Sequence, residues 1–85
     1  MAYRVDLSPG AQRELRGSDS SIRGRILRAL LDLETEPRPP GAKKLKGRGE
    51  LWRIRVGDHR IVYEIRDRIL VVLVVRVAHR REVYR

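Results

Sequence analysis

Arginines alternate with apolar residues in the last third of the chain. Arg53 and Arg55 flank Ile54, and Arg60 follows after a short break. Successive side chains of a β-strand point to opposite faces, so Arg53 and Arg55 should emerge on one face of a sheet while Trp52 and Ile54 occupy the other. The planar guanidinium group matches phosphate oxygens, and a sheet face crowded with such groups suits a polyanion better than a metabolite.

The residue types on these segments make one chemistry feasible, the cleavage of RNA through attack by the neighbouring 2′-hydroxyl. That reaction needs a base, an acid and cations that stabilise the phosphorane, and Arg, His and Tyr can provide them without a metal. A zinc site is not expected, because His59 and His79 are the only histidines and no carboxylate cluster lies at ligand spacing near either. No two acids share an apolar setting, which disfavours a paired-carboxylate hydrolase. Neither a metal nor a cofactor is expected.

The same alternation extends along the next two predicted strands. Arg60 and Glu64 share one side of the second strand, and Arg76 and Arg80 share one side of the third. Glu64 and Arg76 are expected to pair as a structural salt bridge. The polar sides of neighbouring strands should coincide on one concave surface, which would carry Arg53, Arg55, Arg60 and Arg80.

His79 has the opposite parity and falls with Val77, which predicts a partly buried structural position. Its imidazole titrates near neutrality, so His79 is also a candidate acid or base. Trp52 and Tyr63 have the inward parity and are predicted to belong to the core. His59 is predicted to be a hairpin residue without a chemical role.

Two helices and a first strand should precede these segments. Residues 3–7 alternate weakly as a strand, and Ser8-Pro9 is a typical helix start, with a capping hydroxyl before a proline. This helix should run to about Arg16, with Gly17 as its C-cap. A second helix is predicted over residues 20–36 and should stop before Pro37. Its apolar stripe consists of Ile22, Ile26, Leu30 and Leu33, widened by Leu27 and Ala29.

Residues 37–50, PRPPGAKKLKGRGE, are predicted to form a solvated connector pinned by Leu45. Three strands should follow, with reversals at Gly57-Asp58 and at Asp67-Arg68. Residues 69–77 are apolar at both parities except for Arg76, which predicts an interior strand covered on both faces. The sequence thus predicts a single α+β domain over residues 1–85, with a two-helix hairpin on a mainly antiparallel, four-stranded sheet. Candidate RNA-binding lysines in the connector are Lys43, Lys44 and Lys46.

The composition and net charge of the chain limit the classes of partner that it can bind. The net charge is +9 and the pI is near 11.2, which points to nucleic acid, an anionic membrane or an acidic protein. There is no cysteine, so disulfide and thiolate chemistry are excluded. The longest apolar run, residues 69–75, is far short of the ~20 residues needed to span a bilayer, and no secretion signal opens the chain. We therefore expect a soluble cytoplasmic protein without a membrane partner.

The chain resembles the RelE toxins of the RelE/ParE toxin superfamily. The resemblance is carried by LWRIRVGDHRIVYEI and VVLVVRVAHRREVYR, by MAYRVDLSPGAQREL at the start and by KKLKG before the first of the three strands. It implies a microbial-ribonuclease-like fold, ribosome-dependent cleavage of mRNA and inhibition of translation. It also implies a cognate antitoxin encoded by an adjacent gene, which we expect to be acidic and amphipathic.

By position, the resemblance implies a set of catalytic residues: Arg53, Arg55, Arg60, Arg80 and Tyr84. Side-chain chemistry makes Arg60 and Arg80 the candidates for binding the scissile phosphate, because guanidinium forks match its oxygens, and makes Tyr84 a candidate for base stacking or proton transfer. In well-known family members the first pair are lysines, whereas arginine keeps its charge with a pKa above 12. The general base must then be another group or belong to the ribosome.

Two other functions fit the same residues. One is a ParE-like toxin that inhibits gyrase and cleaves no RNA, although ParE-like chains generally lack the Arg/Tyr set at these positions. The other is a basic RNA-binding module without catalysis, since a phosphate-binding sheet with a tyrosine also suits that role. Cleavage of mRNA, inhibition of gyrase, or neither activity distinguishes the three.

Overall fold

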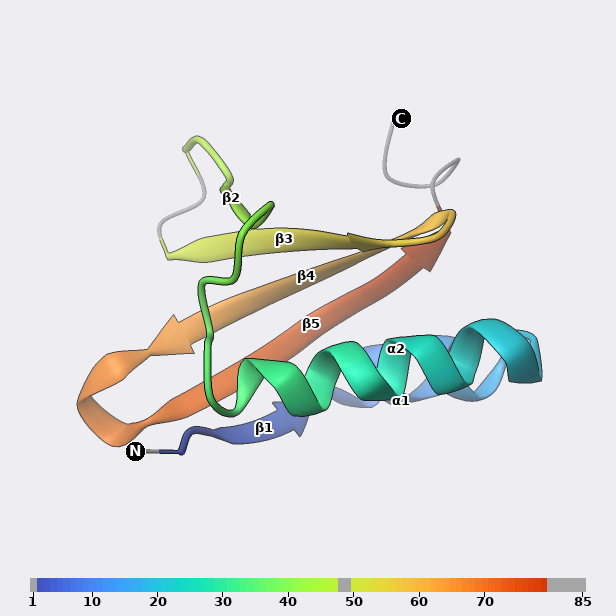
Figure 1. The fold of residues 1–85 in the computed structure, drawn as a ribbon, viewed down its shortest axis with the longest axis horizontal. Helices are drawn as coiled ribbons and strands as arrows, with labels where there is room; N and C mark the ends of the chain where they lie inside the picture. Colours follow the sequence, from blue (N-terminus) through green and yellow to red (C-terminus); the bar gives the residue numbers. More distant parts are fainter. Residues whose placement is uncertain (1, 48–49, 80–85) are drawn as a thin grey trace.

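Five β-strands form one mixed sheet in the computed structural model of this chain, which describes residues 2–47 and 50–79. The order across the sheet is β1-β5-β4-β3-β2, and both helices lie on one side of it (Figure 1). β1 and β5 are parallel, while the other neighbouring pairs are antiparallel. The strands are β1 (Arg4–Leu7), β2 (Lys43–Lys44), β3 (Leu51–Val56), β4 (His59–Arg66) and β5 (Val71–His79).

The α+β class, the helical hairpin and the mainly antiparallel sheet are confirmed, but the predicted number of four strands is wrong. The additional strand is β2, which lies within the segment predicted to be an unstructured connector. It pairs with β3 through only two residues, Lys43 opposite Arg53 and Lys44 opposite Trp52. Such a short strand inside a Pro- and Gly-rich segment leaves no alternating pattern to detect.

Local signals account for both helices. Helix α1 (Pro9–Arg16) begins where the Ser8 hydroxyl oxygen accepts a hydrogen bond from the Ala11 N–H at 3.1 Å, and Gly17 caps its end. Helix α2 (Ser20–Leu33) ends three residues earlier than predicted. The residue before Pro37 is disfavoured in the α conformation. Beyond Leu33, the N–H groups of Glu34 and Thr35 donate to carbonyl oxygens only three residues earlier, which is the tighter 3-10 pattern.

The core lies between the helices and the sheet. Ile26, Leu30 and Leu33 of α2 are buried against Ile61 and Tyr63 of β4, as the apolar stripe predicts. Leu27 was predicted to widen that stripe, but its exposed fraction is 45%. Trp52 packs at the margin of the core, half-buried. Among the described residues, neither helix has the length and apolar character that crossing a membrane requires.

Strand β5 is interior, as predicted, because β1 and β4 flank it. It is not covered on both faces, however, since Val71 and Leu73 on the side away from the helices are only half-buried. A β-bulge explains why apolar residues occur at both parities. Tyr63 pairs with Val74 whereas Val62 pairs with Arg76, so one extra residue between them reverses the alternation.

The β3–β4 turn combines a left-handed backbone at Gly57 with a close approach to α2, and both features favour glycine. Gly57 has φ +58°, and a Cβ on it would lie 2.9 Å from Cδ1 of Ile22. We expect Gly57→Ala to lower the free energy of unfolding by about 1–3 kcal/mol in denaturant titrations. Gly24→Ala is the matched control, because Gly24 is helical and a Cβ there meets nothing within 4 Å. It should stabilise by about 0.5–1 kcal/mol, and equal effects of both changes would contradict this account.

The phenol of Tyr63 provides a pH-dependent test of the core. Tyr63 is fully buried and donates a hydrogen bond to the carbonyl oxygen of Pro37 at 2.8 Å. Burial raises its pKa to about 12. A raised pKa means that the phenol contributes stability that is fully present below pH ~10 and lost as the pH rises towards 12. Phenolate absorbance should therefore show a tyrosine that titrates towards pH 12, and this step should be lost in Tyr63→Phe although Tyr3, whose hydrogen bond to Asp67 also raises its pKa, remains. Titration of every tyrosine near pH 10 would refute the account.

Candidate polyanion-binding face

The strand register brings four basic side chains to one side of β2, β3 and β4. Arg53 stands opposite Lys43 on one flank and opposite Val62 on the other. Arg55 stands directly opposite Arg60. This side is opposite to the one that carries Ile61 and Tyr63 and packs on the helices. We call it the basic face and define it by Lys43, Arg53, Arg55 and Arg60.

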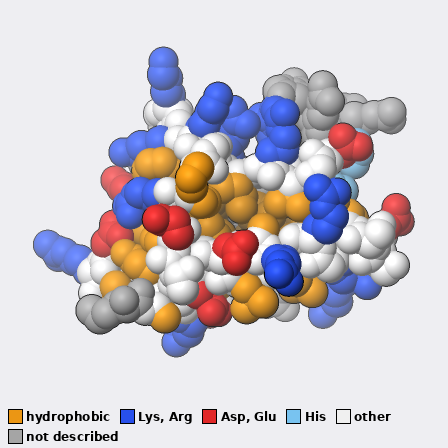
Figure 2. Space-filling model, in the orientation of Figure 1, with side chains coloured by type: hydrophobic (Ala, Val, Ile, Leu, Met, Phe, Trp, Pro, Cys, Tyr) orange, Lys and Arg blue, Asp and Glu red, His pale blue; other side chains and the backbone are white. Residues whose placement is uncertain are grey.

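Figure 2 shows Lys and Arg side chains at several margins of the molecule in this view. Lys and Arg side chains line the upper margin, above β3, on the side of the sheet remote from α2. The apolar surface lies lower in the view, between the sheet and α2. The predicted coincidence of Arg53, Arg55 and Arg60 on one sheet face is confirmed by the register.

Arg60 differs from its neighbours in being almost fully buried, with an exposed fraction of 5%. Arg55, directly opposite, is exposed. The two line a hollow of about 140 Å³ beside the β3–β4 turn, together with Gly57, Asp58 and His59. Charge interactions strengthen as water is excluded, so a phosphate oxygen at this hollow would meet one solvated and one desolvated guanidinium group.

The three connector lysines do not share one environment. Lys43 belongs to the basic face, whereas Lys44 pairs with Trp52 and has the parity of the helix-facing side. Lys46 follows β2 and is exposed. The predicted cluster therefore contributes one lysine to the row of arginines.

The predicted Glu64–Arg76 bridge is wrong. Glu64 pairs with Arg66, two residues along the same strand, and Arg76 pairs with Glu14 of α1 at 2.9 Å. The Glu14 carboxylate also accepts a hydrogen bond from the Val77 N–H at 2.8 Å. β1 ends at Leu7, opposite Val74, so Glu14 takes the place of a strand along the edge of β5 beyond that point. Nothing in the local sequence of α1 signals this role, because it depends on where β1 stops.

His79 lies opposite His59 at the end of the sheet, with ring centroids 5.3 Å apart in an edge-to-face arrangement. Both have the parity of Ile61 and Val77, which face the helices, and both are half-buried. The register thus separates His79 from the basic face. Arg80 and Tyr84, the remaining predicted site residues, lie outside the described residues.

Comparison with known proteins agrees with this architecture. Residues 5–84 match the family model described as ParE toxin of type II toxin-antitoxin system, parDE. The chain is 33% identical to the mRNA interferase toxin RelE of Escherichia coli K12, over 99% of this chain and 92% of that protein. It is 30% identical to Toxin RelG of Mycobacterium tuberculosis, over 100% of this chain and 99% of that protein.

Solved structures share the fold. The archaeal RelE–RelB complex of Pyrococcus horikoshii matches with a TM-score of 0.83 and 29% identity, over 94% of this chain and 97% of that chain. The isolated RelE toxin of E. coli matches with a TM-score of 0.82 and 31% identity, over 98% and 92%. A helical hairpin on a mixed sheet is thus the architecture of a RelE-like toxin. The chain belongs to the RelE/ParE toxin superfamily of type II toxin–antitoxin systems.

Proposed function

We propose that this chain is a ribosome-dependent mRNA endoribonuclease that inhibits translation and works without a metal ion. Its relatives named mRNA interferase support the activity, and the basic face supports the substrate class. Among the described residues, no group of three or more His, Cys, Asp or Glu side chains is placed to hold a metal. Attack by the neighbouring 2′-hydroxyl uses only groups of the kind found here.

One observation carries the proposal, the pairing of Arg55 with Arg60 across β3 and β4. Like charges directly opposite each other on neighbouring strands repel. An arrangement that opposes stability is typical of a functional site. A phosphodiester bound there would bring negative charge between the two guanidinium groups, whose forks match its oxygens.

We assign roles from this geometry and from the family resemblance. Arg60 stabilises the charge that grows on the phosphorane, because a buried donor that is already in place acts mainly in the transition state. The family resemblance gives Arg80 the same role. Arg53 and Arg55, being more exposed, hold the RNA backbone and contribute to the ground state as well. Tyr84 stacks on a base or moves a proton. His79, on the other side of the sheet, is the less favoured acid or base.

The proposed inhibitor is a cognate antitoxin from the adjacent gene. Some of the solved relatives are toxin–antitoxin complexes, among them the RelE–RelB complex of Pyrococcus horikoshii. With a net charge of +9, this chain should attract an acidic, amphipathic segment that blocks the basic face. Co-expression with the neighbouring reading frame should restore growth, and the affinity of the complex should fall as salt increases. If the product of the neighbouring reading frame neither binds this chain nor restores growth, this part of the proposal is contradicted.

Analysis of cleavage products on programmed ribosomes tests the chemistry. Attack by the 2′-hydroxyl leaves 2′,3′-cyclic or 3′-phosphate ends, and cleavage should persist in EDTA once the magnesium requirement of the ribosome is controlled for. Products with 5′-phosphate and 3′-hydroxyl ends would reject the mechanism. Inhibition of gyrase without mRNA cleavage would support the ParE-like alternative, and RNA binding without either activity would support a non-catalytic module.

A further inference from the structure

Strand β2 holds an unfavourable position that its own pairing does not explain. It has two residues, and its first, Lys43, lies directly opposite Arg53 of β3. Two hydrogen-bonded residues give a strand little independent stability, and opposed like charges subtract from it. The position of Lys43 on the basic face must therefore be maintained by contacts outside β2.

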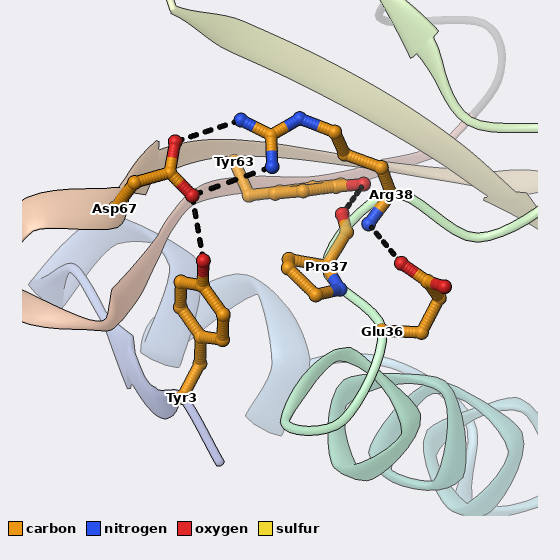
Figure 3. A network of polar contacts seen from close by, with 6 residues as sticks. All are labelled: Tyr3, Glu36, Pro37, Arg38, Tyr63 and Asp67. Atoms are coloured by element: carbon orange, nitrogen blue, oxygen red, sulfur yellow. Dashed lines mark hydrogen bonds and ion pairs between the residues drawn. The ribbon is translucent and has the colours of Figure 1, made fainter. Parts of the chain in front are cut away.

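Arg38 provides such a contact five residues before β2. Its guanidinium group donates to both carboxylate oxygens of Asp67, from Nη1 at 3.3 Å and from Nη2 at 2.9 Å (Figure 3). The Asp67 carboxylate also accepts a hydrogen bond from the Tyr3 hydroxyl at 2.6 Å. The Arg38 Cζ atom lies 5.3 Å from the ring centroid of Trp52 on β3. One side chain thus joins the connector to β3 and to the turn between β4 and β5.

The neighbouring backbone is fixed in the same region. Pro37 is buried, and its carbonyl oxygen accepts the hydrogen bond from Tyr63 (Figure 3). At the other end of the segment, the Leu45 N–H donates to the Leu51 carbonyl oxygen at 2.9 Å. We call residues 37–45 the strap. It is held at both ends, with β2 and Lys43 between the two attachments.

The charge on Asp67 persists at neutral pH. Hydrogen bonds from Arg38 and, next, from Tyr3 hold the pKa of this carboxyl below its usual value. An exposed ion pair with a single contact stabilises little, but a bidentate pair that also stacks on an aromatic ring fixes orientation. Lysine has neither the planar fork nor the stacking surface to reproduce it.

We propose that Arg38 is a positioning residue for RNA binding, which holds the strap through Asp67 and Trp52 so that Lys43 stays beside Arg53 on the basic face. The inference rests on the proposed RNA-directed function. Arg38 acts through Lys43 and does not touch the RNA, because it packs on Trp52, which has the parity of the helix-facing side of the sheet. Arg38 thereby adds Lys43 to the row of phosphate-binding cations on the basic face, although Arg38 itself does not lie on that face.

Binding of a single-stranded RNA oligonucleotide at several salt concentrations tests the proposal. Lys43→Ala should lower the salt-dependence slope by about 0.7, the value for one phosphate contact on a single strand. Arg38→Ala should cause the same loss, and so should Arg38→Lys, which keeps the charge. The double variant Arg38→Ala/Lys43→Ala should bind no more weakly than Lys43→Ala alone. Additive losses would show that Arg38 contacts RNA directly and would overturn the proposal.

Amide hydrogen exchange provides a measurement that does not depend on RNA. Arg38→Ala should accelerate exchange of the Leu45 amide and leave the core strand β4 protected, whereas Arg28→Ala, which removes an exposed arginine from α2, should change neither exchange nor binding. Unchanged exchange at Leu45, or unchanged RNA affinity in Arg38→Ala, overturns the positioning role. A wild-type protein that does not bind the oligonucleotide overturns the basic face as an RNA-binding surface, and this inference with it, whereas the proposed cleavage is tested separately on programmed ribosomes.

Discussion

Replacing Arg60 by alanine should reduce the single-turnover rate of mRNA cleavage on programmed ribosomes by about 10²–10³-fold, the usual effect of losing one donor to transition-state charge. Arg60 is almost fully buried beside Arg55, so its guanidinium group is preorganised at the basic face. Binding of the variant to the same ribosomes should persist, because most phosphate contacts remain. The variant should also fail to arrest growth.

Two further variants and a thermal melt distinguish a loss of catalysis in Arg60→Ala from a loss of folding. Arg28→Ala also removes an arginine, but from the exposed surface of α2, and should cleave at the wild-type rate. Arg55→Ala should act mainly through affinity and its dependence on salt, because Arg55 is solvated in the free protein. A thermal melt of Arg60→Ala should show a folded protein. If that folded variant cleaves at the normal rate, Arg60 is a structural residue and the assignment is wrong.

Leu33→Ala should lower the free energy of unfolding by about 2–5 kcal/mol, the usual cost of a cavity in a core. The Leu33 side chain is fully buried at the end of α2, among the core residues beneath the sheet. Small domains are stable by about 5–15 kcal/mol, so this one truncation removes a large share of the total. Urea denaturation of the purified variant measures the effect through its midpoint.

Leu31 on the same helix provides the matched control. It is 62% exposed, so Leu31→Ala removes the same atoms from the surface and should change stability by no more than about 0.5 kcal/mol. Equal losses in the two variants would show that α2 packs on the sheet with another face. The pair also tests the apolar stripe inferred from periodicity, because Leu31 and Leu33 differ only in their angular position on the helix.

Features with local causes could be predicted from the sequence. The Ser8-Pro9 start of α1, the 3.6-residue stripe of α2 and the Gly57-Asp58 turn each depend on neighbouring residues. The shared face of Arg53, Arg55 and Arg60 followed from strict alternation and a two-residue turn. These features were enough to indicate the fold class and the arginine-lined part of the candidate site.

Features that depend on distant parts of the chain were missed. β2 has too few residues for a pattern, and its Lys43–Arg53 pairing opposes local preference. Arg38 and Asp67 are 29 residues apart, and Glu14 meets Arg76 across 62 residues. Strand alternation alone therefore predicted a pair between Arg76 and Glu64, the nearest acid of suitable parity. It could not predict the pair with Glu14 of α1, which lies along the edge of β5 where β1 has ended.

The interior position of β5 in the sheet affects the order in which the protein can fold during synthesis. β5 is the last of the described strands in chain order, yet both β1 and β4 pair with it. During synthesis from the N-terminus, β1 therefore has no partner until residues 71–79 have been added. Closing so long a loop costs entropy before any contact compensates it, which slows folding. The helical hairpin and the β3–β4 hairpin can form early, but the core that joins them is completed only when β5 enters between its two neighbours.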